Sequence, residues 1–453
     1  MNRAFSVVWF CAAALSPTAV FSYCEELLLP DAIPEKYRAL APLYASPDTG
    51  WIFAQNQLRE RFELDPKGLA LLEAIAKAFT EQGTPLAIMM PPSRPVIAGQ
   101  SVVDASIGGA VAYDAARAGA SFSRMVDMVN RTGIIMPDLQ AIVLNDERLR
   151  DTYYFRRDTH WTPVGAAASA IIVSRAVAQR HPDLFPDAGS VRPQMGADAQ
   201  TLEERGSLSR VVTEICAVVP EAEQMPVPFY PASPGASLFG DEPERPRIAL
   251  LGTSFSNGRQ QDAYRVSDAL AGAFQADVEN YSVSGGGMIA PVEVFIEAGG
   301  LSANYVDLVI WEVPVTDTFG KHDAFRQVLG TLLLPKAIPI GSERPLDASG
   351  KTEWSTTEAA DILIVNTPNG SPEGVAIELA LTTGEIVSIA LSRKGHLPPE
   401  WRLDRAATSL SDLLSSGIER ISVSHDPAVA GDGASVQLMS AKATRTAMDA
   451  QGG

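Results

Sequence analysis

The stretch "RIALLGTSFS", Arg247 to Ser256, runs from four consecutive apolar residues directly into a turn of small residues. A short strand without polar alternation is typical of a parallel sheet that is covered on both faces. Comparable runs occur at 85–92 ("PLAIMMPP"), 134–137 ("IIMP"), 278–283 ("VENYSV") and 306–314 ("VDLVIWEVP"). Segments with apolar residues at helical spacing, such as 72–79 and 122–129, alternate with these runs. The pattern predicts a three-layer α/β/α domain with a parallel sheet.

Ser254 lies in the turn that follows this strand, and we expect a helix over 260–274 after it. A serine in this position stands at the carboxyl edge of a parallel sheet, where open α/β folds place their sites. Gly252 permits a tight turn, and the first amides of a following helix could stabilise an oxyanion. The turn departs from the Gly-x-Ser-x-Gly motif because Ser256 replaces the last glycine. The alternative is that Ser254 only caps the helix.

A serine nucleophile needs a base, and the chain contains five histidines. Within "RDTHWTPVG", 157–165, His160 has a carboxylate two residues before it. Residues i and i+2 of an extended segment project to the same side. Asp158 could therefore accept a hydrogen bond from Nδ1 of His160 and leave Nε2 free for the proton of Ser254.

Two observations bear on the alternative, in which this acid and imidazole have no chemical role. Asp158 could instead pair with Arg156 or Arg157. However, Thr162 as N-cap and Pro163 at the first helical position suffice to start the helix that follows. The sequence alone leaves these two interpretations open.

The glycine run 285–287 follows a predicted strand and lacks the lysine and the spacing of a phosphate-binding loop. It could bring backbone N–H groups close to an oxyanion, or it could be an ordinary turn. The histidines are scattered and the cysteines do not form a close ligand pair. We therefore expect no metal site and no bound cofactor.

Residues 1–22 have the features of a secretory signal peptide, with Arg3 followed by an apolar run and by small residues near Ser22. Export would place the chain in an oxidising compartment. Cleavage near Ser22 would leave Cys24 and Cys216, and an even pair in an oxidising compartment suggests a disulfide. The alternatives are two separate thiols, and a lipid anchor on Cys24, which the bulky residue before it disfavours.

Acidic side chains outnumber basic ones, 54 to 36, and the formal net charge is −18. Nucleic acid is therefore not an expected partner, because a broad basic footprint is absent. An anionic polymer would have to contact a local basic cluster.

Composition changes after residue 335. Prolines and glycines predict a linker at 336–348, and β-like runs separated by turn residues predict a compact β-domain at 349–446. Residues 447–453 are expected to form a flexible tail, and residues 23–335 to form the α/β domain. The segment 182–246 is rich in proline, glycine and acidic residues, and we expect a surface insertion there.

Four motifs together resemble a known family: "RRDTHWTPVGA" (156–166), "LLGTSFSN" (250–257), "SVSGGGM" (282–288) and "VIWEVP" (309–314). They are similar to the periplasmic alginate O-acetyltransferases of the AlgX/AlgJ type, within the SGNH-hydrolase-like superfamily. The resemblance covers roughly 51–314. In that family the Asp-x-His pair precedes the nucleophile in the chain, and this sequence has the same order.

The resemblance implies an SGNH-hydrolase-like fold followed by a β-sandwich resembling a carbohydrate-binding module. By analogy Ser254 is the nucleophile, His160 the general base and Asp158 the orienting carboxylate. The oxyanion donors would be the backbone amides of Ser254, Gly285 and Gly286. The pairing of Cys24 with Cys216 also resembles a disulfide of AlgX-like proteins.

The implied reaction is transfer of an acetyl group, through an acetyl-serine, to hydroxyls of an exopolysaccharide such as alginate. It requires an acetyl donor of unknown identity and implies a polysaccharide modification and export complex with a membrane-bound acyltransferase. Relatives often carry an acidic-basic pair where this chain has Val315 and Thr316, so polymer contacts are the least transferable part. A carbohydrate acetylesterase and a non-catalytic polysaccharide-binding scaffold are the alternatives.

Candidate polymer contacts are aromatic and basic. In the β-domain the basic cluster could receive the carboxylates of a uronic-acid polymer and an indole could stack on a sugar ring, although a solvated loop is the alternative. The candidates are Trp161, Arg259, Arg393, Lys394, Trp401 and Arg402.

Overall fold

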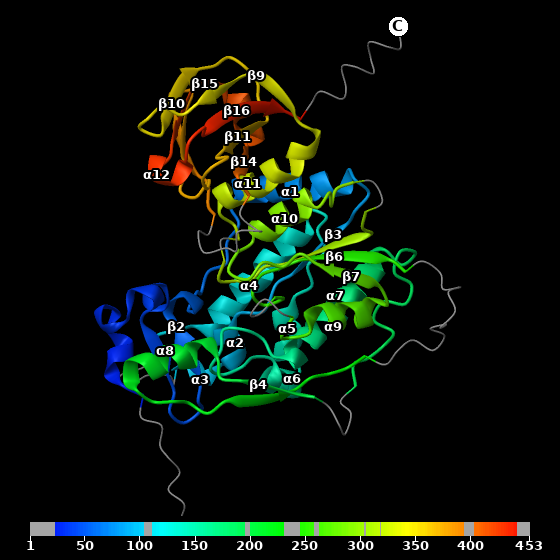
Figure 1. Ribbon diagram of the computed structural model, residues 1–453. Coiled ribbons are helices and arrows are strands. Elements are labelled where there is room, and N and C mark those ends of the chain that lie inside the picture. Colours follow the sequence, from blue (N-terminus) through cyan, green and yellow to red (C-terminus); the bar gives the residue numbers. More distant parts are fainter. Residues whose placement is uncertain are drawn as a thin grey trace, which may run out of the picture.

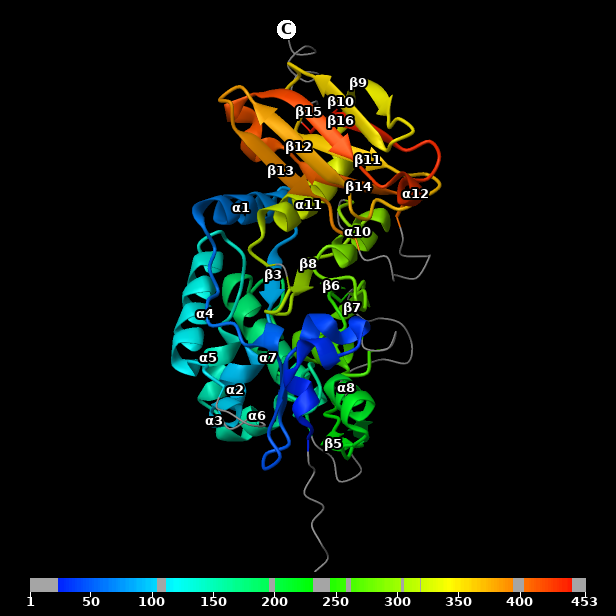
Figure 2. The same cartoon turned by 90° about the vertical axis from the view of Figure 1, so that its left-hand side faces the viewer.

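The computed structural model describes residues 23–103, 111–194, 200–230, 245–257, 262–302, 305–317, 319–393 and 403–441. An α/β domain carries a β-sandwich at one end (Figures 1 and 2). The predicted signal peptide and the predicted tail at 447–453 lie outside the described residues. Among the helices of these residues, none is long and apolar enough to cross a membrane.

The α/β domain is built on a four-stranded parallel sheet, as the short apolar runs predicted. Its order is β3-β8-β6-β7, and residues from β3, β6 and β8 belong to one buried core. The run at 134–137 is reduced to a single parallel bridge between Ala87 and Ile135. The strands are β3 (Leu86–Met89), β6 (Arg247–Leu251), β7 (Asp277–Asn280) and β8 (Leu308–Glu312).

Helices cover both faces of this sheet (Figure 1). On the side of the β-sandwich lie α1 (Pro66–Thr80), α10 (Ala290–Glu297) and α11 (His322–Leu333). On the other side lie α7 (Pro163–Arg180) and α9 (Val266–Phe274), which pack against each other. The shorter or more peripheral helices of the domain are α2 (Arg94–Ala98), α3 (Gln100–Val103), α4 (Ala115–Asn130), α5 (Leu139–Leu144) and α6 (Glu147–Thr152). The three-layer prediction is confirmed.

A second small core joins the first described residues to the segment predicted as an insertion. The strands β1 (Leu43–Ala45) and β2 (Ile52–Ala54) share an apolar cluster with α8 (Ser207–Cys216). The predicted disulfide between Cys24 and Cys216 is present and joins these two parts. The rest of this region consists of 3₁₀ turns η1 (Glu25–Leu28), η2 (Pro30–Ala32), η3 (Glu35–Leu40) and η4 (Gln55–Gln57), and of strands β4 (Thr201–Glu204) and β5 (Glu223–Pro226).

The carboxyl-terminal domain is a sandwich of two four-stranded antiparallel sheets, ordered β10-β15-β12-β13 and β14-β11-β16-β9. Its strands are β9 (Ile338–Pro345), β10 (Lys351–Ser355), β11 (Ile362–Asn366), β12 (Ala376–Leu381), β13 (Ile386–Ala390), β14 (Arg405–Ser409), β15 (Ile418–Ser424) and β16 (Ser435–Ser440). Short helical turns lie at η6 (Leu334–Lys336), η8 (Ser411–Ser416) and α12 (Pro427–Ala430). The predicted linker at 336–348 contains β9, which pairs with β16. Its prolines therefore mark an edge strand, where a missing N–H is tolerated.

The sandwich docks on α11 through tight and partly apolar packing. Apolar residues of β11 and β14 form a cluster with Leu333 and Leu334 at the end of α11. Gly330 allows the closest approach, because a Cβ atom built on it would lie 2.7 Å from the backbone carbon of Thr408. The guanidinium of Arg326 adds an ion pair to Asp412 across the interface.

We predict that Gly330→Ala destabilises the protein by about 1–3 kcal/mol, because the added methyl group meets backbone rather than a flexible side chain. Urea unfolding should show the loss. Gly119→Ala in α4 is the control, since its nearest atom outside the helix backbone would be 3.4 Å away and alanine favours helix. Equal stability of the two variants would contradict the packing described here.

Candidate active site

The carboxyl ends of all four parallel strands open on one cavity of about 310 Å³. The segments after β3, β6, β7 and β8 each contribute to its wall, together with the loop that carries His160 and residues near η4. The lining residues are Leu40, Asn56, Gln57, Pro91, Pro92, Arg94, Pro95, Tyr154, Thr159, His160, Thr253, Ser254, Phe255, Gly285, Gly287, Pro314, Val315, Thr316 and Asp317.

A short hairpin-like loop presents His160 to this cavity. Its two sides are joined by an antiparallel bridge between Tyr154 and Trp161 and by the hydrogen bond from the Thr162 amide to the Tyr153 carbonyl. As predicted, Thr162 caps α7, and Pro163 is at its start. The helix start and the His160 loop thus use different residues.

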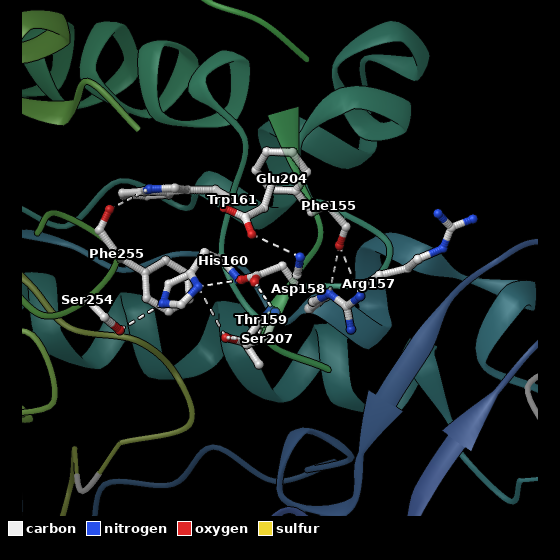
Figure 3. Close-up of polar contacts among 12 residues, drawn as sticks. Phe155, Arg157, Asp158, Thr159, His160, Trp161, Glu204, Ser207, Ser254 and Phe255 are labelled. Atoms are coloured by element: carbon white, nitrogen blue, oxygen red, sulfur yellow. Dashed lines mark hydrogen bonds and ion pairs between the residues drawn. The ribbon is translucent and has the colours of Figure 1, made fainter. Parts of the chain in front are cut away.

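The loop brings the predicted acid, base and nucleophile into contact (Figure 3). His160 Nε2 lies 2.8 Å from Ser254 Oγ, and its Nδ1 contacts Asp158 Oδ1. The same carboxylate oxygen accepts the backbone N–H of His160 at 2.8 Å. A neutral imidazole that donates from Nδ1 to Asp158 presents an Nε2 lone pair to the hydroxyl, which is the arrangement a general base needs.

Asp158 is buried, yet its surroundings favour the ionised form. Burial alone would raise its pKa, but the charge of His160 and the hydrogen bonds from His160 and Ser207 outweigh burial and hold the pKa well below its usual range. The Ser207 amide is the first of α8 and donates to Asp158 Oδ2. A helix amino terminus stabilises a carboxylate through its free N–H groups and its dipole.

The approach of α8 to this loop requires glycine at position 206. Gly206 has φ +89°, and a Cβ atom there would lie 2.1 Å from the Arg157 carbonyl oxygen. The amides of Leu208 and Ser209 bond to that same oxygen. The first turn of α8 therefore hydrogen-bonds both to the Arg157 carbonyl and to the Asp158 carboxylate.

The alternative pairing of Asp158 with a neighbouring arginine does not occur. The backbone amides of Arg156 and Arg157 donate to the Glu223 carboxylate. The Arg157 guanidinium bonds to the carbonyl of Glu221, and that of Arg156 to the carbonyl of Thr49. Asp158 keeps His160 and α8 as its partners.

The turn that carries Ser254 differs from the prediction in one respect. Residues 254–257 form a turn instead of the start of a helix, and α9 begins at Val266. Ser254 is therefore not a helix cap. Its backbone N–H has no acceptor among the described residues, and the same holds for Gly285, which lines the cavity. The N–H of Gly286 instead closes a turn onto the Val283 carbonyl, so its predicted part as an oxyanion donor is wrong.

Aromatic rings fix the imidazole from the sides. The ring centroids of Tyr264 and Phe255 lie 5.3 Å and 4.7 Å from that of His160. Trp161, predicted as a polymer contact, is fully buried and donates its indole N–H to the Phe255 carbonyl at 2.9 Å. It cannot contact a polymer, because its side chain is inside the core and supports the nucleophile turn.

Two charged residues of the site were not predicted from sequence. Glu312, at the end of β8, is wholly buried beneath the Ser254 turn. Arg94 is buried at the cavity wall, and its guanidinium donates to the carbonyls of Ile52, Phe155 and Arg156. Burial lowers the pKa of Arg94 to about 10. A charged residue at the end of an otherwise apolar strand was the available signal for Glu312.

Of the remaining predicted polymer contacts, the structure describes only Arg393. Arg393 is buried between the domains, where its guanidinium lies 2.6 Å from the Glu293 carboxylate. That ion pair occupies its charge, so the prediction of a polymer contact there is wrong. Arg259, Lys394, Trp401 and Arg402 lie outside the described residues. In the ranges that the structure describes, no group of three or more His, Cys, Asp or Glu could hold a metal ion.

Comparison with known proteins identifies the family. Residues 47–315 match the family described as "SGNH hydrolase-like domain, acetyltransferase AlgX". This chain belongs to the AlgX family. The matched residues include Asp158, His160 and Ser254 together with every parallel strand of the sheet.

Curated relatives agree with this membership. "Alginate biosynthesis protein AlgX" of Azotobacter vinelandii is 27% identical over 335 residues, which are 73% of this chain and 64% of the relative. "Probable alginate O-acetylase AlgJ" of Pseudomonas syringae pv. tomato is 26% identical, over 58% of this chain and 66% of the relative. The alignments thus span less than two thirds of each relative's length.

A solved structure extends the likeness of fold to both domains. Pseudomonas aeruginosa AlgX aligns with a TM-score of 0.65 and 18% identity, over 92% of this chain and 98% of that one. The match covers the β-sandwich as well as the AlgX-family domain, because it includes almost the whole chain.

We predict that Asp158→Asn slows acylation of Ser254 by a fluorophosphonate by up to about 10⁴. An amide can donate to Nδ1 and so favours the tautomer whose Nε2 carries a proton. Intact-mass measurement of the adduct over time gives the rate. His160→Ala should lose the reaction as well. Wild-type rates in both variants would show that the Asp158–His160 pair does not activate Ser254.

We predict that Gly206→Ala also slows this acylation, because the methyl group would push α8 away from Asp158. The matched control is Gly83→Ala. Gly83 has a similar positive φ of +76°, with nothing within 4 Å of an added Cβ. Both variants should lose stability from the backbone conformation, measured by thermal unfolding. A control that slows acylation as much as Gly206→Ala would show that α8 has no specific part.

Proposed function

We propose that this chain is a serine-dependent O-acetyltransferase that moves acetyl groups onto hydroxyls of an exopolysaccharide, alginate in the first instance. The observation that carries the proposal is the 2.8 Å contact between His160 Nε2 and Ser254 Oγ, with Asp158 behind the imidazole. The description of the AlgX family supports acetyl as the group that is transferred. The names of the relatives support alginate as the polymer that accepts it.

The first half-reaction would build an acetyl-enzyme. Ser254 Oγ attacks the acetyl carbonyl of a donor while His160 Nε2 takes the hydroxyl proton. The carbonyl oxygen becomes an oxyanion. The N–H groups of Ser254 and Gly285, which have no acceptor within the part of the chain that the structure describes, are its donors. The bond to the donor's leaving group then breaks, and His160 returns the proton to that group.

The second half-reaction would use the same groups in reverse. A sugar hydroxyl enters the cavity, gives its proton to His160 and attacks the acetyl-serine carbonyl. The ester bond to Ser254 breaks, and the proton passes from His160 to Ser254 Oγ. Transfer exceeds hydrolysis when the sugar hydroxyl is held in better alignment than water.

The surroundings of the site support an exported, polysaccharide-facing protein. A disulfide between Cys24 and Cys216 suits an oxidising compartment such as the periplasm. The β-sandwich, docked firmly on α11, is proposed as a carbohydrate-binding module. The acetyl donor is proposed to be supplied through a membrane-bound acyltransferase of a polysaccharide modification and export complex.

We predict that Ser254→Ala abolishes acetylation of polymannuronate. The variant protein should unfold at the same temperature as wild type. Acetyl transfer from a chromogenic acetyl ester to oligomannuronate, followed by mass spectrometry of the sugar, measures the activity. Ser282→Ala is the control, because the buried Oγ of Ser282 has no hydrogen-bond partner among the described residues. It should keep the activity.

The other functions give different results in the same experiment. Acetate release that added oligosaccharide does not change would identify an acetylesterase. Oligosaccharide binding without any acetyl-enzyme in intact-mass measurement would identify a scaffold. Acetylated sugar formed by Ser254→Ala would contradict the nucleophile assignment.

A further inference from the structure

Glu312 is a buried acid that the proposed reaction does not use. It ends β8, next to β6 in the sheet, and its exposed fraction is 0%. Among the described residues, neither a lysine nor an arginine is among the groups that shift its pKa. An unpaired carboxylate in this position is costly unless hydrogen bonds compensate for the lost water.

Among the described residues, the Glu312 carboxylate hydrogen-bonds only to the turn that carries Ser254. Oε2 accepts the Thr253 N–H at 2.7 Å, and both carboxylate oxygens lie within 3.2 Å of the Thr253 hydroxyl. Oε2 also accepts the Ser256 hydroxyl at 3.2 Å. The residues on either side of the nucleophile are thus bound to one carboxylate.

The Thr253 hydroxyl also links Glu312 to Phe255, the residue after Ser254. The Thr253 O–H donates to Glu312, and its oxygen accepts the Phe255 N–H at 3.3 Å. The amides of Ser256 and Asn257 both bond to the Thr253 carbonyl. Of the amides from 253 to 257, only that of Ser254 therefore has no acceptor among the described residues.

The turn sits directly on the carboxylate. A Cβ atom added to Gly252 would lie 2.9 Å from Glu312 Oε2 and 2.8 Å from the Ser256 Cβ. Glycine at this position lets the backbone come close enough for the Thr253 N–H to reach the carboxylate.

We infer that Glu312 is the positioning residue of the nucleophile turn: it binds the amide and hydroxyl of Thr253 so that the Ser254 N–H stays free for the oxyanion. The inference rests on the proposed function and adds a second carboxylate to it. Asp158 orients the base, and Glu312 orients the nucleophile and its amide.

The pKa of Glu312 indicates that this residue does not serve only to stabilise the fold. Burial raises its pKa to about 7, although the Thr253 amide, the Thr253 and Ser256 hydroxyls and the charge of His160 act in the opposite direction. Of the described residues, Tyr154 is a further titratable group that interacts with it. A pKa above the ordinary value means that the folded state binds the proton more tightly, so stability falls as pH rises between about 4.5 and 7. Replacing the acid by a neutral amide removes this loss.

The test uses Glu312→Gln, which keeps the shape of the side chain. The amide presents one oxygen and one NH₂ to the three groups that donate to the carboxylate: the Thr253 N–H, the Thr253 hydroxyl and the Ser256 hydroxyl. The variant's fluorophosphonate acylation rate and its kcat for acetyl transfer should fall tenfold or more, while KM for oligomannuronate stays within twofold. The thermal unfolding midpoint should be measured for the variant and for wild type at pH 5 and pH 8. The difference, variant minus wild type, should be larger at pH 8 than at pH 5. Acylation at the wild-type rate by the folded variant would overturn the inference.

The matched control is Glu293→Gln. Glu293 is also a buried acid whose pKa burial raises, but it faces Arg393 and Gln327 at the domain interface. This variant should lose stability and keep the acylation rate. A fall in acylation equal to that of Glu312→Gln would mean that any buried charge change slows the site, and would overturn the inference.

A second pair of variants covers the case in which Glu312→Gln does not fold. Thr253→Val removes the hydroxyl between Glu312 and the Phe255 N–H and should slow acylation, whereas Thr253→Ser should restore it. Equal rates for valine and serine would overturn the inference. Failure of the acetyltransferase proposal is recognised separately, by Ser254 that reacts with the fluorophosphonate but transfers no acetyl group.

Discussion

The site depends on the parallel pairing of β6 with β8, which aligns Leu251 with Trp311 at their carboxyl ends. Because the two strands run in the same direction, the Ser254 turn and Glu312 leave the sheet at the same edge. Neither could be held there by its own strand alone: the turn needs acceptors for its amides, and the acid needs donors for its oxygens. Their contact satisfies both requirements in a buried region.

A second constraint comes from outside the sheet. The first described residues lie beside α8 (Figure 2). The two parts share a small apolar core, and the disulfide at the end of α8 joins them. The opposite end of that helix binds the Asp158 carboxylate. The orientation of the base is thus tied to a part of the chain that lies outside the parallel sheet, and Gly206 makes that contact sterically possible.

Much of this arrangement could be predicted from local sequence. Short apolar runs predicted the parallel sheet, and Thr162 with Pro163 predicted the start of α7, because these signals depend only on neighbouring residues. The spacing of Asp158 and His160 predicted their contact for the same reason. The predicted linker was wrong because prolines break helices and central strands but are accepted in an edge strand such as β9.

The sequence by itself determined the kinds of groups and their order: a strand that delivers Ser254 to a turn, and an acid and imidazole two residues apart. Only the tertiary structure decided that they meet, that the Ser207 amide and not an arginine partners Asp158, and that Glu312 supports the nucleophile. These contacts join residues separated by 49 to 94 positions. No local pattern encodes them, since hydrogen bonds across such distances follow from how strands and helices pack, and burial decides which polar groups must find each other.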